Sequence, residues 1–225
     1  MDPTNTLYLV RHGENPANLT KEFSCRKIDY LLTPKGRLQA EQTGEYFSAR
    51  QIDAIYTSPL RRAVETAQII AAWLRLPVEE VENFRELDAG ELEDMGGSPK
   101  AWEIHFSVIR EWMSGNYESR FPGGENFLMA RQRIRAGVEQ VLSGRSGQAV
   151  IIVGHGGLFS TGLLDLCPGA DLNILRSKEN HNCSISEMEM RFGENRWVGE
   201  LVRWGDVSHL SAAAAELVSG FPTTR

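Results

Sequence analysis

Three short apolar runs, separated by segments of helical character, limit the possible folds more than any other feature of this chain. The runs are "LYLV" (residues 7–10), "DAIYTS" (53–58) and "QAVIIVGH" (148–155). Each is short, nearly continuous and rich in β-branched residues, as expected of a strand that is buried on both faces of a sheet. The order strand, helix, strand, helix predicts an α/β fold whose sheet is mainly parallel.

The helical segments carry recognisable start signals. Serine or threonine followed by proline reads as an N-cap with proline at the first helical position, and it predicts helices over residues 33–50 and 58–76. A third helix is predicted over residues 126–142, where apolar residues recur at helical spacing. These residues are Phe127, Ile134, Val138 and Val141.

The C-terminal part has a different pattern. "CSISEMEM" (183–190) and "RWVGELVRW" (196–204) alternate apolar and polar residues, which predicts antiparallel strands on one edge of the sheet. Pairing of these edge strands between two copies of the chain would give a homodimer. The alanine run after Ser211 predicts a short helix, and we expect "GFPTTR" (220–225) to be frayed.

Composition excludes several classes of protein. The 225 residues suggest one domain with a full core, and the net charge of -6 argues against a general nucleic-acid or membrane-surface binder. No apolar stretch is long enough to span a bilayer, and the first residues lack the pattern of a signal peptide. The three cysteines have no zinc or disulfide spacing, which favours a reduced, cytoplasmic location.

Charged side chains follow each of the three predicted parallel strands. Ligands of α/β sheets bind beyond the carboxyl ends of the strands, so these residues should share one crevice. Two histidines and at least two arginines in a crevice of an acidic protein predict an anion pocket, and phosphate is its natural occupant. The residues are Arg11, His12, Glu14 and Asn18 after the first strand, Arg61 and Arg62 after the second, and His155 after the third.

Seven motifs in this order resemble the histidine phosphatase superfamily, which includes the phosphoglycerate mutase-like enzymes. They are "LVRHGENPAN", "LTPKGRLQA", "TSPLRRAVETA", "FRELDAGELED", "FPGGEN", "VGHGG" and "NCSI", and the resemblance covers residues 6–210. It implies a three-layer α/β/α sandwich with a mostly parallel central sheet. It further implies a single domain over residues 1–225, with a small helical lid insertion at about residues 92–124.

The resemblance also implies a mechanism. His12 would accept the phosphoryl group as a phosphohistidine, which divides one difficult hydrolysis into two easier steps. Glu86, in "RELDAG", stands where the family has its general acid. Cationic and polar side chains would hold the charge on the phosphoryl oxygens, so no metal and no cofactor is expected. Those side chains are Arg11, Arg62, Asn18 and His155.

Four further residues are implied as substrate or phosphate contacts: Ser24, Cys25, Gly156 and Arg61. The family pattern S-P-L-x-R-A selects Arg62 as the catalytic arginine, which leaves Arg61 as either a solvated residue or a peripheral phosphate contact. Cys25 stands where many relatives have glycine and tryptophan, so the approach of the backbone to the substrate is expected to differ there.

The choice between phosphatase and mutase rests on missing cations. In the mutases that the chain resembles, a lysine and an arginine pair bind the substrate carboxylate, but these positions fall on Gly97, Met113 and Ser114. The mutase insertion before "FPGGEN" is also absent. We therefore predict a metal-independent phosphomonoesterase acting on a small phosphorylated metabolite, with a 2,3-bisphosphoglycerate-dependent phosphoglycerate mutase as the alternative.

Two further readings stay open at this point. A phospho-ligand-binding module without turnover would need the arginines but not a nucleophile and an acid, so His12, Glu86 and His155 argue against it. A metal-dependent hydrolase is disfavoured because no histidine or carboxylate falls at a ligand spacing such as HExxH. The apolar segment 102–112 either selects the leaving group or simply packs.

Overall fold

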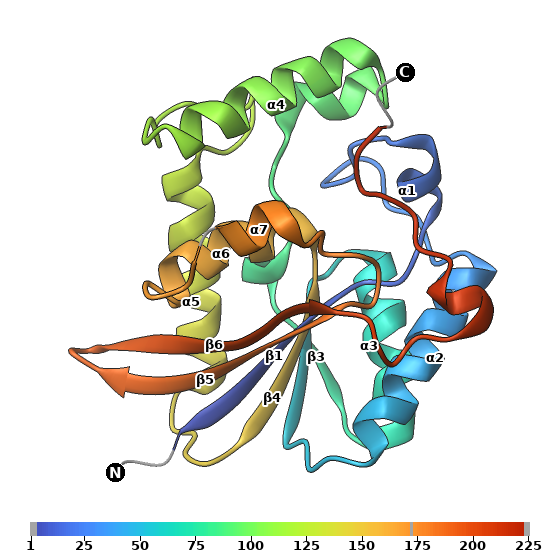
Figure 1. Cartoon of the computed structure of the whole chain (residues 1–225), viewed down its shortest axis with the longest axis vertical. Coiled ribbons are helices and arrows are strands. Elements are labelled where there is room, and N and C mark those ends of the chain that lie inside the picture. The colour runs from blue at the N-terminus through green and yellow to red at the C-terminus, as the bar shows by residue number, and fades with distance from the viewer. Residues whose placement is uncertain (1–3, 172, 223–225) are drawn as a thin grey trace.

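The computed structural model describes residues 4–171 and 173–222 and contains one mixed six-stranded sheet (Figure 1). Its order is β3-β2-β4-β1-β5-β6. The first four of these strands are parallel, whereas β5 runs antiparallel to β1 and β6 antiparallel to β5. The bounds are β1 Asn5–Arg11, β2 Ala54–Thr57, β3 Val78–Glu80, β4 Ala149–Gly154, β5 Ile185–Gly193 and β6 Arg196–Asp206. The mostly parallel sheet and the antiparallel edge pair predicted from the sequence are both confirmed.

Helices cover both faces of the sheet, which confirms the layered α/β architecture (Figure 1). On one face, α2 (Pro34–Ser48) and α3 (Arg61–Leu74) pack over Tyr8, Val10 and Ile151. On the other face, α5 (Phe127–Leu142) and α6 (Gly156–Leu166) pack over the opposite side chains of the same strands. The central strands are therefore buried on both sides, and this explains why their sequences are continuously apolar.

Two of the three predicted helix starts are correct. The side chain of Thr33 accepts a hydrogen bond from Gly36 N–H at the start of α2, and Asn126 caps α5 through Met129 N–H. The predicted N-cap at Ser58 is wrong, because α3 begins at Arg61 with Leu60 at its N-cap. The hydroxyl of Ser58 contacts His155 instead, and this long-range contact overrides the local capping signal.

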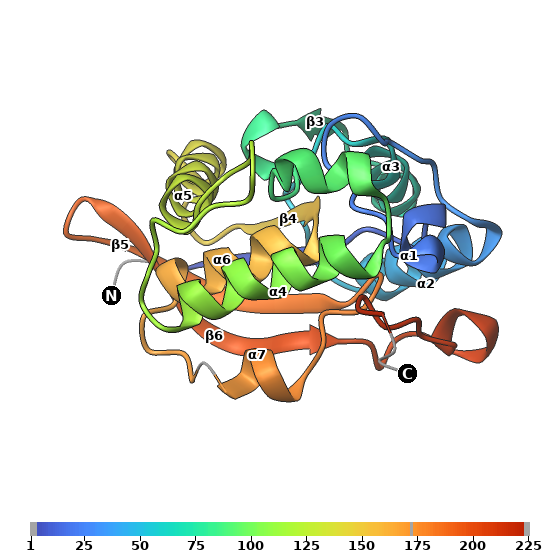
Figure 2. The ribbon, with the colours of Figure 1, turned by 90° about the horizontal axis from the view of Figure 1, so that it is seen from above.

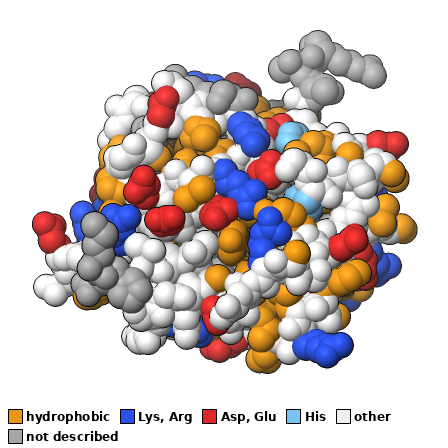
Figure 3. Space-filling view, turned by 60° about the horizontal axis from the view of Figure 1, so that its bottom comes forward, with side chains coloured by type: hydrophobic (Ala, Val, Ile, Leu, Met, Phe, Trp, Pro, Cys, Tyr) orange, Lys and Arg blue, Asp and Glu red, His pale blue; other side chains and the backbone are white. Residues whose placement is uncertain are grey.

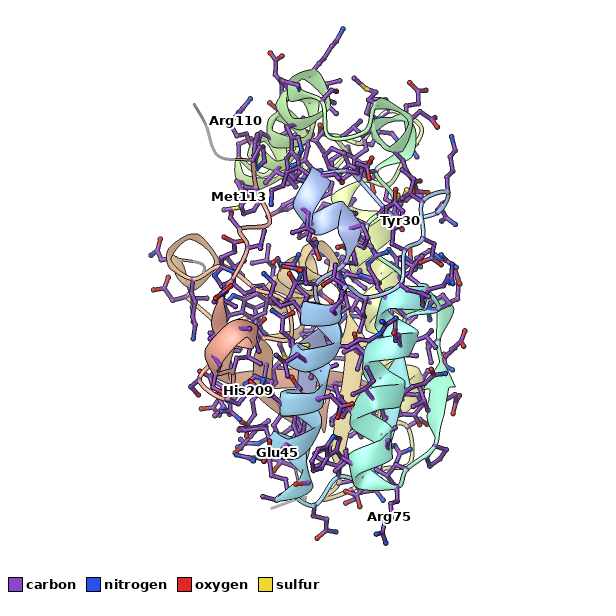
Figure 4. All side chains as sticks on the ribbon, turned by 90° about the vertical axis from the view of Figure 1, so that its right-hand side faces the viewer. Tyr30, Glu45, Arg75, Arg110, Met113 and His209 are labelled. Carbon is purple, nitrogen blue, oxygen red and sulfur yellow. The ribbon has the colours of Figure 1, made fainter. Side chains whose placement is uncertain are left out.

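The predicted helical insertion forms a layer above the carboxyl ends of the strands (Figures 1 and 2). It consists of the 3₁₀ helix η2 (Gly90–Met95) and the helix α4 (Pro99–Met113). In Figure 2, α4 crosses above α6, and in Figure 4 its labelled residues Arg110 and Met113 lie beyond the upper ends of α2 and α3. Smaller elements are α1 (Pro16–Thr20), η1 (Glu82–Phe84) and α7 (Asn173–Ser177).

The C-terminal segment does not behave as predicted. The alanine run forms a 3₁₀ helix, η3 (Ala212–Ala215), but the following residues are not frayed. Gly220 N–H donates a hydrogen bond to the Glu179 carboxylate, and the Phe221 ring contacts Trp102 and Phe106 on α4. Aromatic packing therefore orders a segment whose composition predicted disorder, while residues 223–225 of the predicted frayed end lie outside the described residues.

The absence of nucleic-acid and membrane-surface binding stays a prediction. On the face in Figure 3, acidic and basic side chains are interspersed among hydrophobic ones, without a broad basic patch. Within residues 4–171 and 173–222, no helix has the length and apolar character needed to cross a bilayer. β6 is an edge strand, so the homodimer through this edge stays a prediction.

Two glycines allow the loop after β1 to pack directly on the start of α2. A Cβ atom at Gly13 would lie 2.5 Å from the Gly36 carbonyl oxygen, and one at Gly36 would lie 2.0 Å from the Glu14 carbonyl oxygen. Neither contact can be relieved by a side-chain rotation, because both involve backbone atoms. The motifs "RHGE" and "TPKG" therefore depend on each other sterically.

We expect Gly36→Ala to lower the free energy of unfolding by about 3 kcal/mol, because overpacking against the backbone outweighs the better helix propensity of alanine. Urea denaturation measures this change. Gly193→Ala is the matched control, since a Cβ atom there meets no atom within 4 Å. Equal stability of the two variants would contradict the steric argument.

Candidate active site

Three strand ends bring the predicted phosphate-binding residues together. Arg11 is the last residue of β1 and His12 follows it, while Arg62 lies in the first turn of α3 and His155 is the N-cap of α6. Arg11, His12 and Arg62 line a cavity of about 500 Å³ that extends under α4. Of the predicted site residues, the cavity is lined by Arg11, His12, Asn18, Ser24, Arg62, Glu86 and Gly156.

His12 is held in one tautomer by its two partners. Its Nδ1 atom lies 2.8 Å from the carbonyl oxygen of Gly13, which can only accept, so Nδ1 carries the proton. The Nε of Arg62 lies 3.1 Å from His12 Nε2 and can only donate, so Nε2 is unprotonated and its lone pair accepts this hydrogen bond. A nitrogen lone pair beside a guanidinium is the arrangement that nucleophilic attack on a bound phosphoryl group requires.

The surroundings keep His12 neutral. Burial, followed by the positive charges of Arg62 and Arg11, holds the pKa of His12 well below the usual imidazole value. The hydrogen bond to Gly13 opposes this shift without cancelling it. A depressed pKa leaves the imidazole unprotonated at every pH above that pKa, so the nucleophilic form prevails at neutral pH.

His155 lies beside His12 and is fully buried, with the two ring centroids 5.1 Å apart. Arg62 Nη2 donates to His155 Nδ1 at 3.2 Å, so the proton of this imidazole is on Nε2, which donates to the Ser58 hydroxyl at 2.7 Å. Burial and the charge of Arg62 also hold the pKa of His155 well below its usual range.

Two arginines provide the positive charge of the site. Burial lowers the pKa of Arg62 to about 10 and lowers that of Arg11, so both remain charged at neutral pH. Arg11 donates to the carbonyl oxygen of Asn180, but its Nε is buried without a hydrogen-bond partner among the described residues. An unpaired, buried donor on a cation fits an anionic ligand such as phosphate.

Glu86 faces the same space from the other side. Its carboxylate accepts hydrogen bonds from Leu87 N–H at 2.8 Å, Leu158 N–H at 2.9 Å and Gly157 N–H at 3.3 Å. The last two donors are the free amides at the N-terminus of α6, which attract a negative group. Glu86 is thus held at the edge of the cavity, opposite Arg11 and His12.

Asn18 is oriented by a residue that the sequence analysis did not select. Asn182 Nδ2 donates to Asn18 Oδ1 at 3.0 Å and to the His12 carbonyl oxygen at 3.0 Å. Asn18 also takes part in the capping box of α1, where Asn15 N–H donates to Asn18 Oδ1 and Asn18 N–H donates to Asn15 Oδ1. The "NCSI" motif contained this signal, because its asparagine precedes a strand that pairs with β1.

A buried carboxylate, Glu93, organises the loop that carries Ser24. Its Oε1 accepts the N–H groups of Cys25, Arg26, Lys27 and Ile28 at 2.8–3.0 Å. Burial raises the pKa of Glu93, but these backbone hydrogen bonds outweigh it and leave the pKa below its usual value. Ser24 in turn accepts hydrogen bonds from Arg62 through its hydroxyl and its carbonyl oxygen. The sequence analysis missed Glu93, although "GELED" was part of a recognised motif.

Three of the predicted site residues do not line the cavity: Cys25, Arg61 and His155, which lies behind Arg62. The Cys25 side chain is buried in the hydrophobic core, where burial raises the pKa of its thiol to about 12. Arg61 is exposed and lines a separate shallow depression, because adjacent positions of α3 point in different directions. The candidate anion-site residue Glu14 is turned away as well, with its carboxylate 2.7 Å from Lys35 Nζ.

The site as described can hold and attack a phosphate group with side chains alone. Among residues 4–171 and 173–222, no group of three His, Cys, Asp or Glu side chains is placed to hold a metal ion. The metal independence and the absence of a cofactor stay predictions. A candidate nucleophile (His12), two cations (Arg11 and Arg62) and a carboxyl group (Glu86) all line the same cavity.

Comparison with known proteins identifies relatives along nearly the whole chain. The family model of the histidine phosphatase superfamily (branch 1) matches residues 7–206. The chain is 33% identical to the uncharacterized phosphatase PhoE of Bacillus subtilis, over 90% of this chain and 95% of that protein. It is also 33% identical to the probable phosphoglycerate mutase GpmB of Salmonella choleraesuis, over 93% of this chain and 97% of that protein. Among solved structures, Bacillus stearothermophilus YhfR superposes with a TM-score of 0.77 at 29% identity, covering 91% of this chain and 98% of that one.

Glu93→Gln should lower kcat/KM for a phosphomonoester about tenfold, because the amide is a weaker acceptor for the four N–H groups and loosens the loop beneath Arg62. Steady-state kinetics measure this loss. Glu91→Gln, at an exposed position of the same 3₁₀ helix, is the control and should retain the rate. Wild-type kinetics of Glu93→Gln would show that the carboxylate does not position the loop.

We expect His12 and His155 to remain neutral at pH 6, since the pKa of each is depressed. In the unfolded chain both should titrate near about 6.5. The ¹⁵N chemical shifts of the imidazole nitrogens in phosphate-free buffer measure this directly, with Nδ1 of His12 and Nε2 of His155 protonated. An imidazolium signal from His12 at pH 6 would refute the assignment.

Proposed function

The chain belongs to the histidine phosphatase superfamily, and from this membership we propose that it is a metal-independent phosphomonoesterase acting through a phosphohistidine on a small phosphorylated metabolite. The observation that carries the proposal is the neutral His12, whose Nε2 lone pair faces the buried guanidinium of Arg62.

In the first step, His12 Nε2 attacks phosphorus. The N–P bond forms as the bond between phosphorus and the ester oxygen breaks, and the proton of Glu86 goes to the leaving oxygen. The proton stays on His12 Nδ1 and remains hydrogen-bonded to the Gly13 carbonyl oxygen, which stabilises the positive charge that develops on the ring. The dephosphorylated alcohol then leaves through the cavity.

In the second step, water attacks the phosphohistidine. The carboxylate of Glu86 takes a proton from the water, the P–N bond breaks, and inorganic phosphate and neutral His12 are restored. Arg11, Arg62 and Asn18 would bind the equatorial oxygens in both steps, and His155, whose ring nitrogens contact Arg62 and Ser58, would hold Arg62 in place. Because these donors are already fixed by neighbouring residues, little reorganisation is needed in the transition state.

The residues of the insertion favour hydrolysis over phosphoglycerate mutase activity. Gly97 packs its backbone against Thr20 and Lys21, Met113 is exposed, and the Ser114 hydroxyl donates to its own helix at Glu111. None of these three positions provides the cation that would bind a glycerate carboxylate. The similarity to a probable phosphoglycerate mutase keeps the mutase as the second candidate.

Phosphate release in EDTA from a panel of phosphomonoesters tests the proposal. We expect release that persists in the chelator and falls about 10³-fold or more in His12→Ala. Glu86→Gln should lose about 10²-fold or more with an alkyl phosphate but much less with 4-nitrophenyl phosphate, whose leaving group needs no proton. Glu91→Gln serves as the control for the carboxylate substitution.

Three outcomes would contradict this function. Loss of activity in EDTA would indicate a metal-dependent hydrolase. Interconversion of 3- and 2-phosphoglycerate with added 2,3-bisphosphoglycerate, without phosphate release, would establish the mutase. Tight phosphate or vanadate binding without turnover of any ester would indicate a phospho-ligand-binding module.

A further inference from the structure

The cavity is much larger than a phosphate group requires, and its two ends differ in chemistry. About 500 Å³ is typical of a pocket that encloses a drug-sized ligand. The phosphate end contains the charged residues described above, whereas the part beneath α4 is lined mainly by aromatic side chains. Those that carry the argument are Phe23, Trp102, His105, Phe106, Phe121 and Phe221.

The two ends are linked through one short stretch of chain. Ser24 accepts hydrogen bonds from Arg62, and the preceding residue, Phe23, packs against Trp102 with ring centroids 4.7 Å apart. A phosphomonoester bound with its phosphorus atom beside His12 would therefore direct its ester substituent toward these rings. The C-terminal segment adds Phe221, whose ring lies 5.9 Å from Phe106 and 6.1 Å from Trp102.

His105 is the polar group at the centre of this aromatic wall. Its ring centroid lies 5.1–5.5 Å from those of Phe23, Trp102, Phe106 and Phe121, and it is stacked on Phe121 with an angle of 13°. Its Nδ1 is buried without a hydrogen-bond partner in the described part of the chain. The surrounding rings carry no charge, and burial lowers the pKa of His105 to about 4, so its imidazole is neutral.

Two of the three indole groups that line the cavity already have partners, whereas Trp204 Nε1 is buried without one among the described residues. Trp102 Nε1 donates to the Lys21 carbonyl oxygen at 2.9 Å, and Trp112 Nε1 donates to the Ser119 carbonyl oxygen at 2.7 Å. Each of these two indoles is thus used to hold α4 or its following loop in place. His105 remains as an unpartnered polar group on a wall that otherwise favours flat, apolar surfaces.

We infer that the substrate is a phosphomonoester of a planar, apolar, uncharged alcohol whose leaving group packs under α4 and carries one hydrogen-bonding group directed at His105. This inference rests on the proposed function and specifies its substrate class. An anionic leaving group such as glycerate would lose its hydration against the aromatic rings and should be a poor substrate. Lys21 and Lys178 also line the cavity, but Lys21 Nζ already donates to the carbonyl oxygens of Asn18 and Ser219.

A series of primary alkyl phosphates tests the inference, because their leaving groups have similar basicity. The series is ethyl phosphate, 2-phenylethyl phosphate, its 3- and 4-hydroxy derivatives, and 3-phosphoglycerate. We expect kcat/KM to rise about 30-fold or more from ethyl to 2-phenylethyl phosphate, from burial of the ring. For one of the two hydroxy derivatives, kcat/KM should rise roughly a further tenfold because its hydroxyl forms a hydrogen bond with His105.

Matched variants locate these effects. Phe106→Ala should lower the ratio of kcat/KM for 2-phenylethyl phosphate to kcat/KM for ethyl phosphate about tenfold. Phe192→Ala, which removes an exposed ring on β5, should leave this ratio unchanged. His105→Phe keeps the ring and should abolish the preference for the hydroxy derivative. His209→Phe is its control: the pKa of His209 is also lowered to about 4, chiefly by burial, but it lies beside α2, away from α4 (Figure 4).

The outcomes separate this inference from the proposed function. Hydrolysis of no ester in the series would overturn the function itself. Hydrolysis of ethyl phosphate or 3-phosphoglycerate as efficiently as the phenylethyl esters would overturn the inference and leave the phosphatase standing. An unchanged ratio in Phe106→Ala, or a retained hydroxyl preference in His105→Phe, would likewise overturn it.

Discussion

The site depends on the hydrogen bonds that the guanidinium of Arg62 makes. Its Nε faces the lone pair of His12, its Nη2 contacts His155 and the Ser24 carbonyl oxygen, and its Nη1 contacts the Ser24 hydroxyl. A buried cation is costly unless its donors are used, and here the described donors are directed at neutral acceptors. The same group fixes the tautomers of both imidazoles, lowers their pKa values and holds the loop of the substrate site.

The parallel sheet explains why such a cluster can be stable. Four parallel strands end at one edge, where the polar groups of β1, α3 and α6 meet above a core that is continuously apolar. The antiparallel pair β5 and β6 then closes the other side of β1, and Cys183 N–H donates to the Arg11 carbonyl oxygen at 3.0 Å. Backbone pairing on both sides of β1 thus fixes the two residues at its end.

The sequence predicted features that depend on local pattern and failed where long-range contacts decide. The continuous apolar strands, the α2 cap, the α5 helix and the convergence of Arg11, His12, Arg62 and His155 follow from local signals and from the geometry of parallel sheets. Ser58 was misassigned as an N-cap because its partner, His155, lies 97 positions away. Glu93 and Asn182 were missed for the same reason, since a carboxylate or amide that binds distant backbone groups looks like a surface residue in sequence.

The two elements of the insertion, η2 and α4, differ in how freely their residues can be replaced. η2 contributes Glu93, whose carboxylate accepts hydrogen bonds from the backbone of residues 25–28 and so supports the phosphate end of the cavity. α4 contributes aromatic rings to the other end. Replacement of α4 residues would change which alcohols fit, while replacement of Glu93 would damage catalysis on every substrate. Substitutions in α4 can therefore change which alcohol is bound and leave the phosphate-binding residues unchanged. The carboxylate of Glu93, in contrast, supports the phosphate end of the cavity whichever alcohol is bound.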